Sequence, residues 1–173
     1  GDGNDTITAN AGDDTIDAGS GDDTIYGGAG DDSIDGGSGN DTASYYDIDS
    51  GGVQVDLEAG TATGAGGNDT LAGIENVEGT DQDDTLTGDD QDNILEGRDG
   101  DDIIDAADGD DYIRAGTGSD TVDGGDGTDT LSYNDVTDTG VVIDMNAGTT
   151  TGGSGADAWS DTFTNMENAT GTN

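Results

Sequence analysis

The sequence lacks cysteine, proline, histidine and lysine, and its only basic residues are two arginines. Without cysteine, neither disulfides nor zinc–thiolate sites can stabilise the fold. Without histidine, cysteine or lysine, the usual pairings of a nucleophile with a base are missing, so we expect the chain not to be an enzyme in its own right. Carboxylate pairs such as a glycosidase uses are abundant, but among 42 acidic residues no single pair is informative.

Apolar residues are also scarce, at 28% hydrophobic and 4% aromatic. Low hydrophobicity with high net charge is typical of disordered chains, but the regular spacing of isoleucine, leucine and valine argues against disorder here. No apolar run approaches the roughly 20 residues of a transmembrane helix, so we expect no membrane insertion. The first residues do not resemble a signal peptide, so we expect any export signal to lie outside this segment.

The charge is almost entirely negative, because the chain has 42 acidic residues and only two arginines, which gives a formal net charge of −40. Such a chain repels nucleic-acid phosphates and anionic lipid headgroups, which excludes nucleic acid as a partner. It attracts cations instead, and divalent cations are the natural counter-charge.

An acidic residue recurs every nine residues in two stretches of the chain. An aliphatic residue follows it two positions later in almost every repeat, and glycine precedes it by two positions in nine of eleven repeats. Eleven repeats in a fixed phase predict a repetitive fold. The recurring positions are Asp5, Asp14, Asp23, Asp32 and Asp41, followed by Asp84, Asn93, Asp102, Asp111, Asp120 and Asp129.

A longer repeat encloses the nonapeptides, because the segment from Asp41 matches that from Asp129 and the segment from Asp69 matches that from Asp161, at offsets of 88 and 92 residues. The chain therefore divides into a first array (1–44), a first spacer (45–78), a second array (79–132) and a second spacer or cap (133–173). Near the end, Gly171 and Thr172 mirror Gly79 and Thr80, where the second array starts. We therefore expect a further array to follow, as in a tandem-repeat protein.

Each nonapeptide combines turn chemistry with a short strand. In residues 27–35, GGAGDDSID, the glycines allow positive φ and close backbone contact, and the last three residues alternate as a strand does. Two turns and two short strands per eighteen residues predict a solenoid with its aliphatic side chains stacked inward. This aliphatic spine is too thin to overcome the carboxylate repulsion. Ca²⁺ is the natural stabiliser because it accepts six to eight carboxylate and carbonyl oxygens, whereas Mg²⁺ demands a stricter octahedron.

These repeats follow the pattern G-G-x-G-x-D-x-U-x and resemble the RTX (repeats-in-toxin) calcium-binding nonapeptides. The resemblance implies an all-β fold, a right-handed parallel β-roll in which Ca²⁺ lies between turns of neighbouring coils. It also implies that each ion takes two aspartates eighteen residues apart. The implied pairs are Asp5 with Asp23, Asp14 with Asp32, Asp23 with Asp41, Asp84 with Asp102, Asp102 with Asp120 and Asp111 with Asp129, and Asn93 with Asp111 departs from the pattern because an amide carries no charge.

By the same resemblance, turn carbonyls complete each calcium site. The turn residues that the resemblance assigns to the metal are Gly1, Gly3, Asn10, Gly12, Ala18, Gly19, Ser20, Gly21, Gly27, Ala29, Gly36, Ser38, Thr80, Gln82, Gly97, Arg98, Asp99, Gly100, Ala106, Ala107, Asp108, Gly109, Ala115, Thr117, Gly124 and Asp126. The acidic residues immediately before the repeating ones are expected to be solvated side chains that point away from the turns.

The spacers carry further elements. Asp69 lies in a repeat in the right phase, with Leu71 as its aliphatic residue, so the first spacer is a candidate to continue the roll and to hold another ion. The corresponding segment around Asp161 is the weaker candidate, because Trp159 stands where glycine belongs. The segments VQVDL and VVIDM, from Val53 and Val141, alternate as strands. The aromatic residues are expected to pack at the array ends or, in the alternative interpretation, to line a ligand groove; they are Tyr45, Tyr133, Trp159 and Phe163.

The sequence therefore predicts a calcium-binding module of a secreted bacterial protein that folds on calcium binding after type I secretion. An alternative is a tandem segment of a large surface adhesin or matrix protein, with a glycan or cell-surface partner. A third interpretation is an accessory module of a secreted enzyme.

Overall fold

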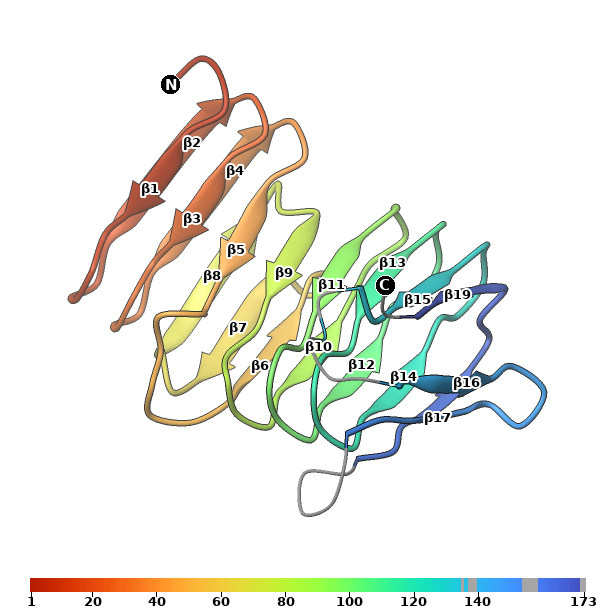
Figure 1. Cartoon of the computed structure of the whole chain (residues 1–173). Helices are drawn as coiled ribbons and strands as arrows, with labels where there is room; N and C mark the ends of the chain where they lie inside the picture. The colour runs from red at the N-terminus through yellow and green to blue at the C-terminus, as the bar shows by residue number, and fades with distance from the viewer. Residues whose placement is uncertain (135, 137–139, 154–158, 172–173) are drawn as a thin grey trace.

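In the computed structural model, residues 1–134, 136, 140–153 and 159–171 are described, and their regular elements are all β-strands. Two sheets face each other and form a parallel β-roll, which confirms the predicted fold class (Figure 1). Thr172, expected to open a further array, lies outside the described residues. No helix in the described part of the chain is long and apolar enough to cross a membrane.

The strands are short, as the nonapeptide pattern predicts. In the first array and first spacer they are β1 (Thr6–Thr8), β2 (Thr15–Ser20), β3 (Thr24–Tyr26), β4 (Ser33–Ser38), β5 (Thr42–Ser44), β6 (Val53–Asp56), β7 (Thr61–Gly64), β8 (Asn68–Ala72) and β9 (Asn76–Glu78). In the second half they are β10 (Thr85–Thr87), β11 (Ile94–Glu96), β12 (Ile103–Asp105), β13 (Tyr112–Arg114), β14 (Thr121–Asp123), β15 (Thr130–Ser132), β16 (Val142–Asp144), β17 (Thr149–Thr151), β18 (Thr162–Thr164) and β19 (Asn168–Thr170).

Successive nonapeptides alternate between an eight-stranded and an eleven-stranded sheet. The eight-stranded sheet has the order β1-β3-β5-β9-β11-β13-β15-β19, and all its pairs are parallel. The eleven-stranded sheet has the order β2-β4-β8-β7-β6-β10-β12-β14-β18-β17-β16. Within each array, paired residues are eighteen positions apart, as in Ile7 with Ile25 and Ile104 with Val122. Each coil of the roll is therefore two nonapeptides.

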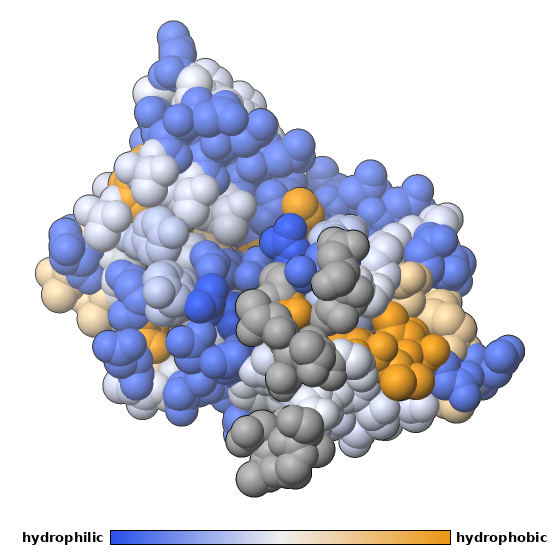
Figure 2. Space-filling model, in the orientation of Figure 1, coloured by the Kyte–Doolittle hydropathy of each residue, from blue (hydrophilic) through white to orange (hydrophobic). Residues whose placement is uncertain are grey.

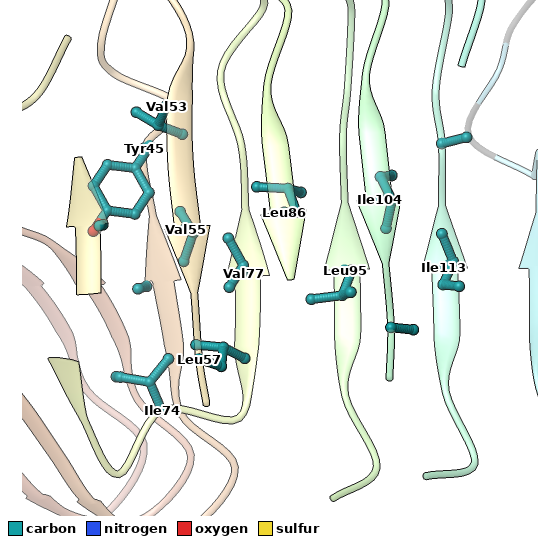
Figure 3. Packing of buried hydrophobic residues seen from close by; sticks show 14 of the residues in the cluster. Tyr45, Val53, Val55, Leu57, Ile74, Val77, Leu86, Leu95, Ile104 and Ile113 are labelled. Atoms are coloured by element: carbon teal, nitrogen blue, oxygen red, sulfur yellow. The ribbon is translucent and has the colours of Figure 1, made fainter. Parts of the chain in front are cut away.

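The aliphatic residue of each nonapeptide points into the space between the sheets. Ile25, Leu86, Leu95, Ile113 and Leu131 have no exposed surface. Figure 3 shows how Val55, Leu86 and Ile104 form one row and Val77, Leu95 and Ile113 form the facing row. Because each coil contributes only one such residue per sheet, the core is a thin double column.

Each spacer continues both sheets and adds a hairpin to one of them. After β5 the chain forms β6, which pairs in parallel with β10 of the second array, and returns through antiparallel β7 to β8, which pairs with β4. In the facing sheet β9 joins β5 directly to β11. The second spacer repeats this arrangement, since β18 pairs with β14, β17 with β18, β16 with β17, and β19 with β15.

The aromatic residues of the spacers belong to the core. Tyr45, Tyr133, Trp159 and Phe163 are 3%, 0%, 8% and 5% exposed, and the rings of Tyr133 and Trp159 stack with centroids 5.6 Å apart. The packing role is therefore confirmed: within the described part of the chain these four side chains are buried.

Close contact between neighbouring coils can be tested with two glycines of nearly equal φ, 119° at Gly12 and 117° at Gly21. A Cβ at Gly12 would meet nothing within 4 Å, whereas one at Gly21 would lie 2.5 Å from the carbonyl carbon of Gly3. Because both alanine variants carry the same backbone strain and only Gly21→Ala adds a clash, we expect Gly21→Ala to lower the free energy of unfolding by about 1 to 3 kcal/mol more than Gly12→Ala. Urea unfolding in saturating calcium measures the difference, and equal losses would contradict the contact.

Candidate metal sites

The repeating aspartates form a ladder along each side of the roll, in the turns that precede the strands. In each array the Oδ1 atom of one aspartate accepts a hydrogen bond from the backbone N–H of the aspartate eighteen residues earlier. The N–O distances are 2.8 Å from Asp23 to Asp41 and 2.9 Å from Asp102 to Asp120. One oxygen of each carboxylate thus joins neighbouring coils.

The second oxygen, Oδ2, is left without a partner in most of the ladder. It is buried and has no hydrogen bond within the described residues at Asp14, Asp23, Asp32, Asp41, Asp102, Asp111, Asp120 and Asp129. A buried polar atom without a partner costs about 1 to 3 kcal/mol, and more if it is charged. Recurrence of the same orphan atom, four times in each array, indicates that these turns are built to hold a cation.

Four of the implied pairs have an orphan oxygen on both aspartates. They comprise one pair on each side of the roll in each array, namely Asp14 with Asp32, Asp23 with Asp41, Asp102 with Asp120, and Asp111 with Asp129. The pair of Asp5 with Asp23 differs because the side chain of Asp5 is 46% exposed.

Burial raises the pKa of the ladder carboxyls. The pKa rises to about 7 for Asp102 and Asp111 and to about 8 for Asp120, chiefly because burial removes water from the charged form. Repulsion from neighbouring carboxylates adds to the shift, whereas the accepted backbone hydrogen bond opposes it. The pKa values of Asp41 and Asp129 are raised for the same first reason. A bound cation would reverse this balance by favouring the ionised form.

The turn residues assigned to the metal lie where successive coils touch. A Cβ at Gly30 would lie 2.3 Å from the carbonyl oxygen of Gly12, and one at Gly118 would lie 1.8 Å from that of Gly100. Many of these carbonyls also accept a backbone hydrogen bond from a neighbouring coil, including those of Gly1, Asn10, Ser20, Ala29, Ser38, Arg98, Ala107, Thr117 and Asp126. Because a carbonyl oxygen has two lone pairs, such a bond still leaves one for a cation.

The first turn of the second array is closed by protein donors. Asp84 occupies its ladder position, but its Oδ1 accepts from Val53 N at 2.7 Å and Thr80 Oγ1 at 2.9 Å, and its Oδ2 accepts from Thr80 N at 2.6 Å. The backbone N–H of Gln82 donates to Thr80 Oγ1. This is one of the two repeats in which glutamine replaces glycine, so its departure from the pattern coincides with a carboxylate that has no orphan oxygen.

The next turn, at Asn93, is closed in a similar way. Asn93 Oδ1 accepts from the backbone of Asp89 at 2.9 Å, and Asn93 Nδ2 donates to the backbone oxygen of Glu75 at 2.9 Å and to Asp89 Oδ1 at 3.2 Å. Gln91 N donates to Asp89 Oδ1 as well. The amide therefore finds all its partners inside the protein, which fits the departure of Asn93 from the aspartate pattern.

In both spacers a tyrosine hydroxyl takes the place that is open in the arrays. Asp69 Oδ1 accepts from Asp32 N at 2.9 Å, but its Oδ2 accepts from Tyr45 OH at 3.1 Å. Asp161 repeats the arrangement, since its Oδ2 accepts from Tyr133 OH and from Thr150 Oγ1. Burial and the adjacent carboxylate raise the pKa of both tyrosines, so each hydroxyl stays a donor.

Two ladder positions, Glu75 and Glu167, were not predicted from the sequence. Glu75 Oε2 accepts from Asp41 N at 2.8 Å, and Glu167 Oε2 accepts from Asp129 N at 2.9 Å, so each glutamate follows the last aspartate on its side of an array. The available signal was their identity at the 92-residue offset, within IEN and MEN, in a chain with only five glutamates.

The acidic residues that precede the ladder are exposed as expected, but they also hold the coils together. Asp13 Oδ1 accepts from Asp31 N at 3.1 Å, and Asp101 Oδ1 accepts from Ser119 N at 2.8 Å. This second set of bonds runs from the later coil to the earlier one, opposite in direction to the first.

Removal of the Tyr45 hydroxyl tests its bond to Asp69. Tyr45→Phe leaves the buried Asp69 Oδ2 without a donor, so we expect the free energy of unfolding to fall by about 1 to 3 kcal/mol. Tyr46→Phe is the matched control because Tyr46 is 49% exposed and should change little. Urea unfolding in calcium compares the two, and an unchanged Tyr45→Phe variant would contradict the role given to the hydroxyl.

The donor set of these turns fits calcium. In the described ranges no three His, Cys, Asp or Glu side chains converge into a metal cluster, so each candidate site consists of two carboxylates and turn carbonyls. All these donors are oxygens, and Ca²⁺ takes six to eight of them from carboxylates and backbone carbonyls alike. The nitrogen and sulfur ligands that zinc or copper prefer are missing from these turns.

The comparison with protein families agrees with this donor set. The family model of the RTX calcium-binding nonapeptide repeat matches residues 1–24, 9–43, 63–104, 78–113 and 105–139. No curated protein matches the chain. Among solved structures, the extracellular lipase LipA from Serratia marcescens is similar with 17% identity and a TM-score of 0.35, and the match covers 94% of this chain and 37% of the lipase chain. The chain thus spans little more than a third of that lipase. Because the matched segments cover more than half of its residues, the chain belongs to the RTX calcium-binding nonapeptide repeat family.

Proposed function

We propose that this chain is a module that remains unfolded until it binds calcium and folds into the β-roll after export by type I secretion. RTX calcium-binding repeats are typical of secreted bacterial proteins. The observation that carries the proposal is the set of buried aspartate oxygens without a partner, four in each array. A chain of net charge −40 holds these carboxylates out of water and next to one another. While these carboxylates are ionised, such a fold requires a cation.

The free energy of calcium binding is large enough to fold the module. Extracellular calcium modules have dissociation constants of about 10⁻⁴ to 10⁻³ M. At a tenfold excess of calcium each site contributes about 1.4 kcal/mol, so four paired sites contribute about 6 kcal/mol. That is comparable to the whole stability of an ordinary domain. In a compartment with far less calcium than the dissociation constant this contribution vanishes, and the carboxylates repel one another.

The proposed mechanism depends on the difference in calcium concentration between the cytosol and the outside of the cell. In a low-calcium cytosol the aspartates of the ladder stay hydrated and the chain stays extended, which suits passage through an exporter. Outside, the same aspartates lose their water to the turns and the strands pair. No side chain of the module takes a catalytic role in this proposal.

Far-UV circular dichroism tests the proposal. We expect a disordered spectrum in excess chelator at neutral pH, a β spectrum in millimolar calcium, and little response to the same concentration of magnesium. Equilibrium dialysis should count about four tightly bound ions per chain. A chain that is equally folded in chelator, or that binds two ions or fewer, would overturn the proposal.

A further inference from the structure

The first spacer shows how an array is attached to the strands before it. β6 pairs with β10 through Val55 and Leu86, and β9 pairs with β11 through Val77 and Leu95. As a result Val55 and Val77 are each 1% exposed, and Leu57 is 9% exposed. Figure 3 shows Val55 and Val77 in continuous rows with the side chains of the second array.

The second spacer has the same strands, and among the described residues no array covers them. Ile143 and Met145 are the counterparts of Val55 and Leu57 at the 88-residue offset, and Ala169 is the counterpart of Val77 at the 92-residue offset. Ile143 and Ala169 are only partly buried, and Met145 is 40% exposed. β16 and β19 are the last strands of their sheets. The hydrophobic surface at the right of Figure 2 lies where Figure 1 shows β16.

We propose that the open edges of β16 and β19 together form a docking surface for a further RTX nonapeptide array that continues both sheets. An uncovered strand edge presents unpaired N–H and C=O groups, and here it also presents apolar side chains whose counterparts are buried. The occupant is known by its chemistry, because the same two edges in the first spacer carry a nonapeptide array. This inference goes beyond calcium-dependent folding and does not depend on it.

One contact shows which kind of array fits. At the first spacer, Arg98 of the second array bonds to Glu78 Oε1 at 2.8 Å and to Asp81 Oδ1 at 2.9 Å, and its guanidinium lies 4.0 Å from the centre of the Tyr46 ring. The second spacer has Thr170 and Asn134 where the first has Glu78 and Tyr46. It offers neither the carboxylate nor the ring.

A neutral residue is therefore expected at the Arg98 position of the docking array. The first array has such a residue, because Asn10 occupies that position eighty-eight residues earlier, with the same backbone angle, φ 80° against 81°. The surface on β16 and β19 thus fits an array of the first kind better than one of the second.

An extended chain tests the docking. A second copy of residues 82–173 joined after Asn173 stands in register, because 171–173 correspond to 79–81. The appended copy carries Trp159→Phe, so the single tryptophan of the original chain reports on its own second spacer. In saturating calcium we expect the urea midpoint of Trp159 fluorescence to lie about 1 M or more above that of the original chain.

Two variants make the test specific. Met145→Asp in the original copy should change the original chain little, since Met145 is 40% exposed there, but should abolish the gain in the extended chain. Arg98→Asn in the appended copy should raise the midpoint further. Equal midpoints for the two chains, or a gain that survives Met145→Asp, would overturn the proposal. So would self-association of the original chain in calcium that Met145→Asp removes, because the occupant would then be a second copy.

Discussion

Without calcium at pH 8 the chain should be unfolded, and acidification to about pH 4 should fold it with no metal present. The reason is the raised pKa of the buried ladder carboxyls, about 7 for Asp102 and Asp111 and about 8 for Asp120, chiefly from desolvation. In the unfolded chain these groups return to the ordinary value of 3.8.

The sign of the pH effect follows from proton binding. Between pH 3.8 and about 8 the folded chain binds more protons than the unfolded chain, so the stability of the metal-free fold falls as the pH rises through this window. Each unit of pKa difference corresponds to about 1.4 kcal/mol per group. Protonation also reduces the net charge of −40, which weakens repulsion along the whole roll.

The measurement combines two signals, because an acid state can be compact without being native. Far-UV circular dichroism reports strand formation, and near-UV circular dichroism reports the packed Tyr133–Trp159 stack. Saturating calcium supplies the control: there the ladder must be ionised to bind, so acidification should destabilise the chain instead. A metal-free chain that is as unfolded at pH 4 as at pH 8 would show that carboxylate charge is not what prevents folding.

The parts of the fold that were predictable from the sequence are those determined by the nine-residue repeat. Asp23 and Asp41 lie on one side of the roll because two nonapeptides make one coil, and Ile25 is buried because the aliphatic position alternates with polar ones. Strand pairing eighteen residues apart follows from the same count.

What the sequence did not reveal depends on side-chain geometry or on long-range pairing. That β6 would pair with β10 rather than with β4 is decided by the return of the hairpin through β7, which no period encodes. The Tyr45 hydroxyl reaches Asp69 only because the hairpin of β6 and β7 returns the chain to β8, next to β4. Glu75 occupies a ladder position with a side chain one methylene longer than that of aspartate. The nine-residue aspartate pattern does not include it.

The second large effect concerns Asp102, for which we expect Asp102→Asn to act in opposite directions with and without calcium. Asp102 Oδ1 accepts from Asp84 N at 2.8 Å, and asparagine can keep that bond. The orphan Oδ2 of Asp102 is buried, and the variant replaces it with an amide that repels a cation and carries no charge. Calcium binding should therefore weaken, while the metal-free fold should become more stable.

Asp105→Asn is the matched control. Asp105 lies three residues after Asp102, and its side chain is exposed on the outer face of β12, so the variant removes the same charge without touching the ladder. We expect Asp102→Asn to lose one bound ion, since Asp102 and Asp120 form one of the four pairs with an orphan oxygen on both aspartates, and to need several-fold more calcium for half-folding. Losing one site at tenfold excess removes about 1.4 kcal/mol of calcium-dependent stability. Asp105→Asn should keep its ion count and shift only slightly.

Mutating a buried residue usually lowers stability more than mutating an exposed one. In chelator we expect the opposite, with Asp102→Asn more stable than Asp105→Asn. At pH 8 the wild-type chain must hold Asp102 ionised and out of water, against a pKa of about 7, so a neutral amide removes an unfavourable term that Asp105→Asn leaves in place. Urea titrations of metal-free chains at low pH, where all are folded, and then at increasing pH would show Asp102→Asn unfolding at a higher pH than either the wild type or Asp105→Asn. A ladder aspartate whose asparagine variant is less stable both with and without calcium would be a purely structural hydrogen-bond acceptor. The regular orphan oxygens would then need an explanation other than a bound cation.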